Sequence, residues 1–141
     1  MARSKKLTLL YLLYQAGKHI ESMAKTHKGD EANQAMILAY VAKKPATISD
    51  IAEFAGIRVS AATTKVLALE RLGLLARAAG GDKRSHQVVL TNKGKQRIDM
   101  IERHMEQKME GVQLGITKAS VRQMIAALRR IRWEELYEKH V

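Results

Sequence analysis

The side chains best suited to chemistry lie in two groups between residues 60 and 86. The first group is small, polar and basic, and consists of Ser60, Ala61, Thr63, Thr64 and Lys65. The second group is basic, with Lys83 and Arg84 in a glycine-rich loop and His86 directly after it. Hydroxyl and lysine side chains can hydrogen-bond base edges in the major groove of DNA, while lysine and arginine neutralise phosphates. This order predicts one element that contacts bases and another that holds the DNA backbone.

Two short helices are predicted to position the first group. Thr47 and Asp50 have the spacing of a capping box, which begins a helix that Gly56 ends. Ser60 is predicted to be the N-cap of the next helix. At 100° per residue, Ala62, Val66 and Leu69 form its buried stripe, and Ala61, Thr64 and Ala68 lie opposite. A helix that enters a groove needs such a small outward face, although an ordinary surface helix would also show it.

A β-hairpin is predicted to carry the second group. Residues 74–79 and 86–91 are strand candidates, and GGDKRS joins them, with two glycines suited to positive φ. Lys83 and Arg84 lie at the tip, where they are either solvated charge or phosphate contacts. In the second case Arg84 would enter the narrow minor groove and His86 would touch a phosphate. Arg77, in the first strand, is also a candidate DNA contact.

The charge of the chain agrees with a polyanionic partner. The net charge is +11, from 25 Lys and Arg against 14 Asp and Glu. Residues 58–97 hold nine basic and two acidic side chains, a local excess of +7. Because this excess coincides with the two groups above, it favours nucleic acid over a basic surface without a partner.

The flanking segments are predicted to be helices: 5–26, 31–43, 92–110 and one that Thr117 caps. The first is apolar on most sides, which predicts that a second subunit covers it. In the last helix, four aliphatic side chains are predicted to face inward: Val121, Ile125, Leu128 and Ile131. The fold class is therefore mainly α with a small β-hairpin. We predict a single domain over residues 1–141, with a DNA-binding lobe at 31–97 and dimerisation helices at 1–28 and 98–141.

The sequence argues against several other classes of protein. It has no cysteine, and aromatic residues make up only 4% of it, so the core must be aliphatic. The apolar run at residues 7–14 is too short to span a bilayer and has no signal-peptide cleavage site, so we expect no membrane partner and a cytoplasmic protein. Five scattered histidines show no metal-ligand spacing. No catalytic motif is present, so we expect neither an enzyme nor a cofactor.

The ordered motifs resemble the MarR family of winged helix-turn-helix regulators. The resemblance rests on residues 48–77, on Asp82-Lys83-Arg84, and on Leu90-Thr91 followed by Gly94. It implies a homodimer with interlocked terminal helices and two recognition helices in successive major grooves of a palindromic site. It also implies that Asp82 orients a basic side chain in or near the wing, that Arg84 contacts DNA, and that residues 60–65 begin the recognition helix.

The leading hypothesis is a sequence-specific, double-stranded DNA-binding regulator of transcription, acting as a repressor by occlusion. The alternatives are a non-specific architectural DNA-binding protein and a winged-helix module for protein–protein interaction. The family commonly binds small-molecule effectors between the DNA-binding lobe and the dimer helices. Four residues would line such a cleft if their helices face each other, and are otherwise core and interface residues: Tyr11, Tyr14, Met36 and Tyr40.

Overall fold

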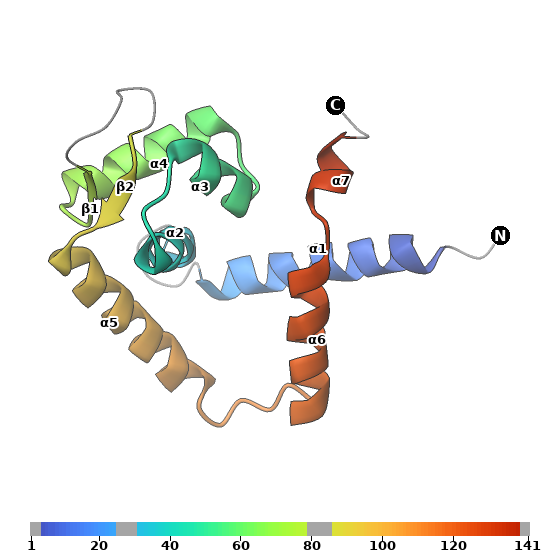
Figure 1. Ribbon diagram of the computed structural model, residues 1–141. Coiled ribbons are helices and arrows are strands. Elements are labelled where there is room, and N and C mark those ends of the chain that lie inside the picture. Colours follow the sequence, from blue (N-terminus) through green and yellow to red (C-terminus); the bar gives the residue numbers. More distant parts are fainter. Residues whose placement is uncertain (1–3, 25–30, 79–85, 139–141) are drawn as a thin grey trace. The chain divides into compact units, whose positions relative to one another are not determined.

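The computed structural model describes residues 4–24, 31–78 and 86–138. The elements in chain order are α1 (Lys5–Ala24), α2 (Glu31–Lys43), α3 (Ile48–Ala55), α4 (Val59–Arg71), β1 (Leu75–Arg77), β2 (Val88–Leu90), α5 (Asn92–Met109), α6 (Lys118–Arg130) and α7 (Glu134–Glu138) (Figure 1). The chain divides into two compact units, residues 1–107 and 108–141. The predicted mainly helical fold with a small antiparallel hairpin is confirmed.

The first unit is built around an aliphatic core, as the composition predicts. In Figure 1, α2, α3, α4 and the two strands lie together, and these elements contact one another. The largest fully buried side chains come from the three helices, from β2 and from the residue just before β1: Ile37, Leu38, Ile51, Val66, Leu74 and Val88. The core therefore fixes α4 from behind and leaves its opposite face in solvent.

Helix α3 begins and ends where the sequence predicts. The Thr47 hydroxyl accepts a hydrogen bond from the Asp50 amide at 3.1 Å, and the Asp50 carboxylate accepts one from the Thr47 amide at 3.1 Å. Gly56 ends the helix in the left-handed conformation, with φ 65°. This cap and this glycine set the tight turn into α4.

The prediction that Ser60 caps α4 is wrong. Arg58 is the N-cap, in extended conformation and without a side-chain capping bond. Its carbonyl accepts the first helical hydrogen bond, from the Ala62 amide at 3.0 Å. Because the backbone already turns at Val59, Ser60 lies inside the first turn, where its side chain is exposed.

The hairpin is shorter than predicted and has an extra neighbour. Ala76 pairs with Val89 at the centre of the ladder. Ala46, just before α3, exchanges two backbone hydrogen bonds with Val88, at 3.1 and 2.7 Å. This bridge ties the segment between α2 and α3 to the hairpin. Residues 79–85, which include the predicted hairpin tip, lie outside the described residues.

The terminal helices carry much exposed apolar surface in the single chain. Along α1, the exposed large side chains are Leu7, Leu9, Leu10, Tyr11, Leu12, Tyr14 and Ile20. Thr117 caps α6 as predicted, through a 3.0 Å bond from the Ser120 amide. The predicted inward face of α6 is wrong for the single chain, because Ile125 and Leu128 are exposed, and Val121 and Ile131 only half-buried. None of the described helices combines the length and hydropathy that a bilayer crossing requires.

Candidate nucleic-acid interface

Helix α4 presents a narrow exposed strip of small side chains. Ser60, Thr64 and Ala68 recur at four-residue intervals, and all three are exposed. Ala61 and Thr63 beside them are half-buried. The opposite stripe is buried as predicted: Ala62, Val66 and Leu69. Further along the same helix, Leu67 and Arg71 are also exposed, so the face is free of bulky side chains only in its first turns, where the helix backbone can approach base edges closely.

The two threonines of α4 already use their hydroxyl protons. Oγ1 of Thr63 donates to the Val59 carbonyl at 2.9 Å, and Oγ1 of Thr64 donates to the Ser60 carbonyl at 3.1 Å. Each oxygen keeps lone pairs that can accept from a partner. In a major groove, Thr64 would therefore accept from the amino groups of adenine or cytosine, or place its methyl group against thymine.

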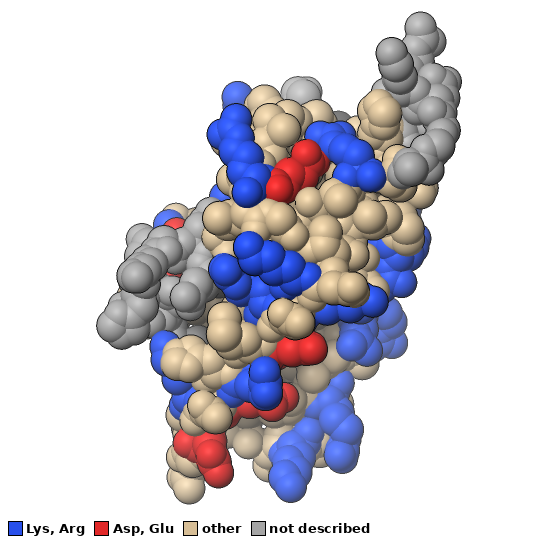
Figure 2. All heavy atoms as spheres, turned by 90° about the vertical axis from the view of Figure 1, so that its left-hand side faces the viewer, with Lys and Arg blue, Asp and Glu red and all other residues tan. Residues whose placement is uncertain are grey.

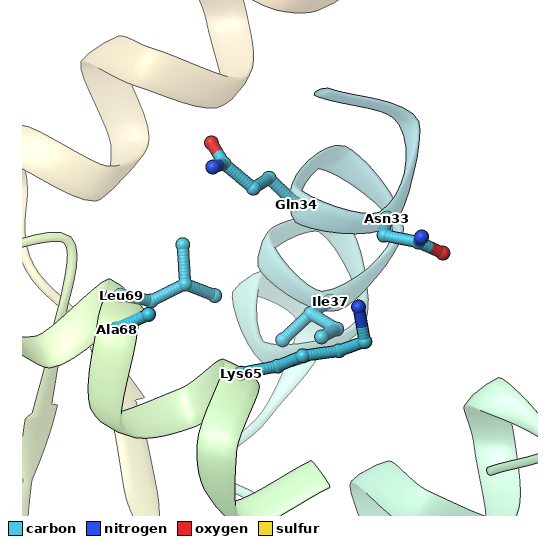
Figure 3. A pocket seen from close by; sticks show the side chains of 6 residues that line it. All are labelled: Asn33, Gln34, Ile37, Lys65, Ala68 and Leu69. Atoms are coloured by element: carbon cyan, nitrogen blue, oxygen red, sulfur yellow. The ribbon is translucent and has the colours of Figure 1, made fainter. Parts of the chain in front are cut away.

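Lys65 lies apart from this strip. Figure 3 shows its side chain extending from α4 across Ile37 toward α2. It helps to line a hollow of about 60 Å³ between the two helices, together with Asn33, Gln34, Ile37, Ala68 and Leu69. Lys65 is half-buried and its side chain lies beside α2. To contact DNA, this side chain would have to leave the hollow.

Arg58 is a candidate DNA contact that the sequence analysis did not single out. It is exposed at the N-cap of α4, directly before the small strip. The positive end of the helix dipole adds to its charge there, which favours a phosphate. A basic residue immediately before Val59-Ser60 was the available signal in the sequence.

Arg77 is held against α4 rather than directed only to solvent. Its Nε donates to Oε1 of Glu70 at 2.7 Å, and the two side chains are 34% and 22% exposed. This ion pair connects the last turn of α4 with β1. Arg77 thus positions the hairpin, and its predicted DNA contact would involve the rest of the guanidinium.

Three of the predicted site residues belong to the hairpin tip that the sequence predicts. Asp82, Lys83 and Arg84 lie outside the described residues, so their roles stay predictions. His86 is exposed just before β2. Other exposed basic side chains of the lobe are Arg58 at the start of α4, Arg71 at its end, Arg77 on β1, and Lys93 and Lys95 on α5. Figure 2 shows a face on which Lys and Arg are spread among few acidic side chains.

The four predicted effector-cleft residues are not gathered around the hollow between α2 and α4. Tyr11 and Tyr14 on α1 are exposed, by 54% and 68%. The ring of Tyr40 stacks on Phe54 of α3, with centroids 4.2 Å apart, and Met36 is half-buried. The cleft stays a prediction. Within the described ranges, no group of three or more His, Cys, Asp or Glu side chains could hold a metal.

Comparisons with known proteins agree with this geometry. Residues 31–85 match the model of the MarR family. Among curated proteins, no sequence matches the chain. Among solved structures, the transcriptional regulator BldR from Sulfolobus solfataricus is 20% identical with a TM-score of 0.66, over 92% of this chain and 100% of that one.

Two other similar solved structures are of proteins that respond to a small molecule. BpsR from Bordetella bronchiseptica, whose DNA binding is regulated by 6-hydroxynicotinic acid, is 20% identical with a TM-score of 0.71, over 87% of this chain and 97% of that one. The heme sensor PefR from Streptococcus agalactiae is 27% identical with a TM-score of 0.52, over 91% of each chain. The family model thus matches the segment that contains the helix-turn-helix, and the chain shares the winged-helix fold of these solved structures along most of its length.

Proposed function

We propose that the protein is a sequence-specific regulator of transcription that binds double-stranded DNA as a homodimer. The observation that carries the proposal is the exposed strip Ser60, Thr64 and Ala68 on α4, with Arg58 at its start. The core fixes this helix from behind, and the Glu70–Arg77 pair fixes the hairpin beside it. Such a helix fits a major groove, and the basic hairpin fits the adjoining backbone.

The exposed apolar side chains of α1 support the homodimer. Leu7, Leu10 and Tyr14 are 41%, 41% and 68% exposed in the single chain. Apolar surface in such quantity on a helix is typical of a surface that another protein covers. A second copy presents the same surface, which a twofold axis would bring together. Two recognition helices would then contact a palindromic site, and occupancy of a promoter by the dimer would repress transcription.

Titration of a mixed-sequence duplex at several salt concentrations tests the DNA-binding part. Affinity should fall steeply, with a log–log slope of roughly −0.9 per phosphate contact. Mass measurement in solution tests the dimer, and Leu10→Glu should shift it toward monomer. If the protein bound no duplex even at low salt, a protein–protein interaction module would be favoured. The net charge of +11 would then be explained by an acidic protein partner instead of DNA.

An architectural DNA-binding protein is the second candidate, because the excess of basic side chains over residues 58–97 supports it equally. Competition separates the two functions. A regulator should prefer its own site over random duplex by about 10³-fold or more, whereas an architectural protein should show little preference.

A further inference from the structure

The turn that follows α4 is held by the residues that begin α5. Three successive carbonyl oxygens in this turn each accept a hydrogen bond. Leu72 accepts from Nζ of Lys93 at 2.8 Å, and Gly73 accepts from Oγ1 of Thr91 at 2.6 Å. Leu74 accepts from the Thr91 amide at 3.2 Å. The end of the recognition helix is therefore joined to α5 by polar contacts with defined directions.

The backbones at this joint are in direct contact. The Gly94 amide donates to Oγ1 of Thr91 at 3.0 Å, which closes the first turn of α5. A Cβ placed on buried Gly94 would collide with the carbonyl oxygen of Leu74 and lie 2.7 Å from Cδ1 of Leu90. Because no side chain separates the two segments, α5 cannot tilt without moving the turn that ends α4.

Lys93 contributes both charge and packing to the joint. Its ammonium lies at the C-terminal end of α4, where the helix dipole is negative. Its Cδ lies 3.6 Å from the position that a Cβ on Gly73 would occupy. Gly73 itself has φ 77°, so the chain reverses there in a conformation suited to glycine. The neighbouring Lys95 is also exposed, but it makes none of these contacts.

We propose that Thr91, Lys93 and Gly94 form a latch that fixes the angle between α4 and α5, and that Lys93 is thereby a positioning residue for half-site spacing. The proposal rests on the proposed function, since spacing matters only to a dimer that reads two half-sites. If α5 belongs to the dimer framework, the latch holds the two recognition helices at one separation. A looser latch should let the dimer accept sites with altered spacing.

The test compares Lys93→Met with Lys95→Met, which removes the same charge two residues away. Affinity is measured for the selected operator and for versions with one base pair inserted or deleted between half-sites. One base pair turns the second half-site by roughly a tenth of a helical turn, so the parent and Lys95→Met should bind the altered sites more weakly. Lys93→Met should reduce this spacing penalty by about 2- to 30-fold.

Thr91 gives a second arm of the same test. Thr91→Val removes the hydroxyl and should behave like Lys93→Met, while Thr91→Ser keeps it and should behave like the parent. Thermal unfolding identifies a variant that does not fold. If Lys93→Met lost affinity equally at every spacing, or kept the spacing penalty of the parent, the proposal would be wrong.

Amide hydrogen exchange of the DNA-free protein tests the latch independently of the proposed function. The amides of Gly73 and Leu74, which bond to the Glu70 and Leu69 carbonyls, should exchange faster in Lys93→Met than in Lys95→Met. A parent protein without a preferred DNA site would contradict the proposed function, and with it the role in spacing. Unchanged exchange in Lys93→Met would contradict the latch itself.

Discussion

Nε of Arg77 lies 2.7 Å from Oε1 of Glu70, and this contact joins the last turn of α4 to the first strand of the hairpin. The two residues are seven positions apart in the chain, with the α4–β1 turn between them. The pair therefore orients the hairpin with respect to the helix that is proposed to enter the groove. Arg77, whose contact with DNA stays a prediction, therefore also has a structural role in holding the hairpin.

Removing this ion pair should cost modest stability. Glu70→Gln is expected to lower the free energy of unfolding by no more than about 1 kcal/mol, because both side chains are partly solvated. A double-mutant cycle with Arg77→Met, followed by urea unfolding, isolates the coupling. Glu134→Gln is the control, since its pair with Arg132 is far more exposed. A coupling indistinguishable from that of the control pair would show that Glu70 does not orient the hairpin.

The capping box of α3 should also contribute to the free energy of unfolding. Thr47→Val keeps the shape of a half-buried side chain but removes the hydroxyl that accepts from the Asp50 amide. The expected loss is about 1 kcal/mol in the free energy of unfolding. Ser49 is exposed and lies two residues after Thr47, so Ser49→Ala should change the free energy of unfolding little. Denaturant unfolding measures the free energy of unfolding of both variants. Equal losses in the two would show that the Thr47 cap is not what stabilises α3.

Thr64 should determine preference at one base pair of each half-site. Its hydroxyl proton goes to the Ser60 carbonyl, so in the proposed complex its oxygen would act as an acceptor toward a base. Thr64→Val should cost about 1–3 kcal/mol at that base pair and leave the others unaffected. Binding to a set of singly substituted operators measures this. Thr8→Val is the control, because Thr8 makes the same type of intrahelical bond on α1. An unchanged base preference in Thr64→Val would remove Thr64 from the interface.

Arg84 should act on affinity more than on sequence preference. Arg84→Ala is expected to weaken binding to all duplexes and to reduce the salt slope by about 1, as for the loss of one phosphate contact. Arg129→Ala on α6 removes an equal charge from an exposed position outside the DNA-binding lobe. The wing assignment would be wrong if both variants bound a specific duplex as tightly as the parent.

Local signals in the sequence were enough to predict most helices of the lobe. Thr47, Asp50 and Gly56 specify the ends of α3 through contacts within a few residues of each other. The periodicity of Ala62, Val66 and Leu69 likewise predicts which face of α4 is buried, and this is confirmed. In both cases the determining interactions are short in range or follow directly from helix geometry.

Contacts between distant segments could not be predicted in the same way. The Ala46–Val88 bridge joins the segment between α2 and α3 to β2, and no side-chain pattern marks it. Ser60 was misplaced because the backbone begins α4 without any side-chain cap. The inward position of Lys65 depends on where α2 packs, and the Lys93 bond to Leu72 depends on the turn after α4. Each of these needs the tertiary arrangement.

Selection from a pool of randomised duplexes at about 0.15 M salt, followed by sequencing, would show whether the protein prefers one DNA sequence. We expect a palindrome with half-sites about one helical turn apart, because two copies of α4 would lie in successive major grooves. Retention of duplexes without any consensus would contradict sequence-specific binding by this strip of α4, and would assign the protein to the architectural class.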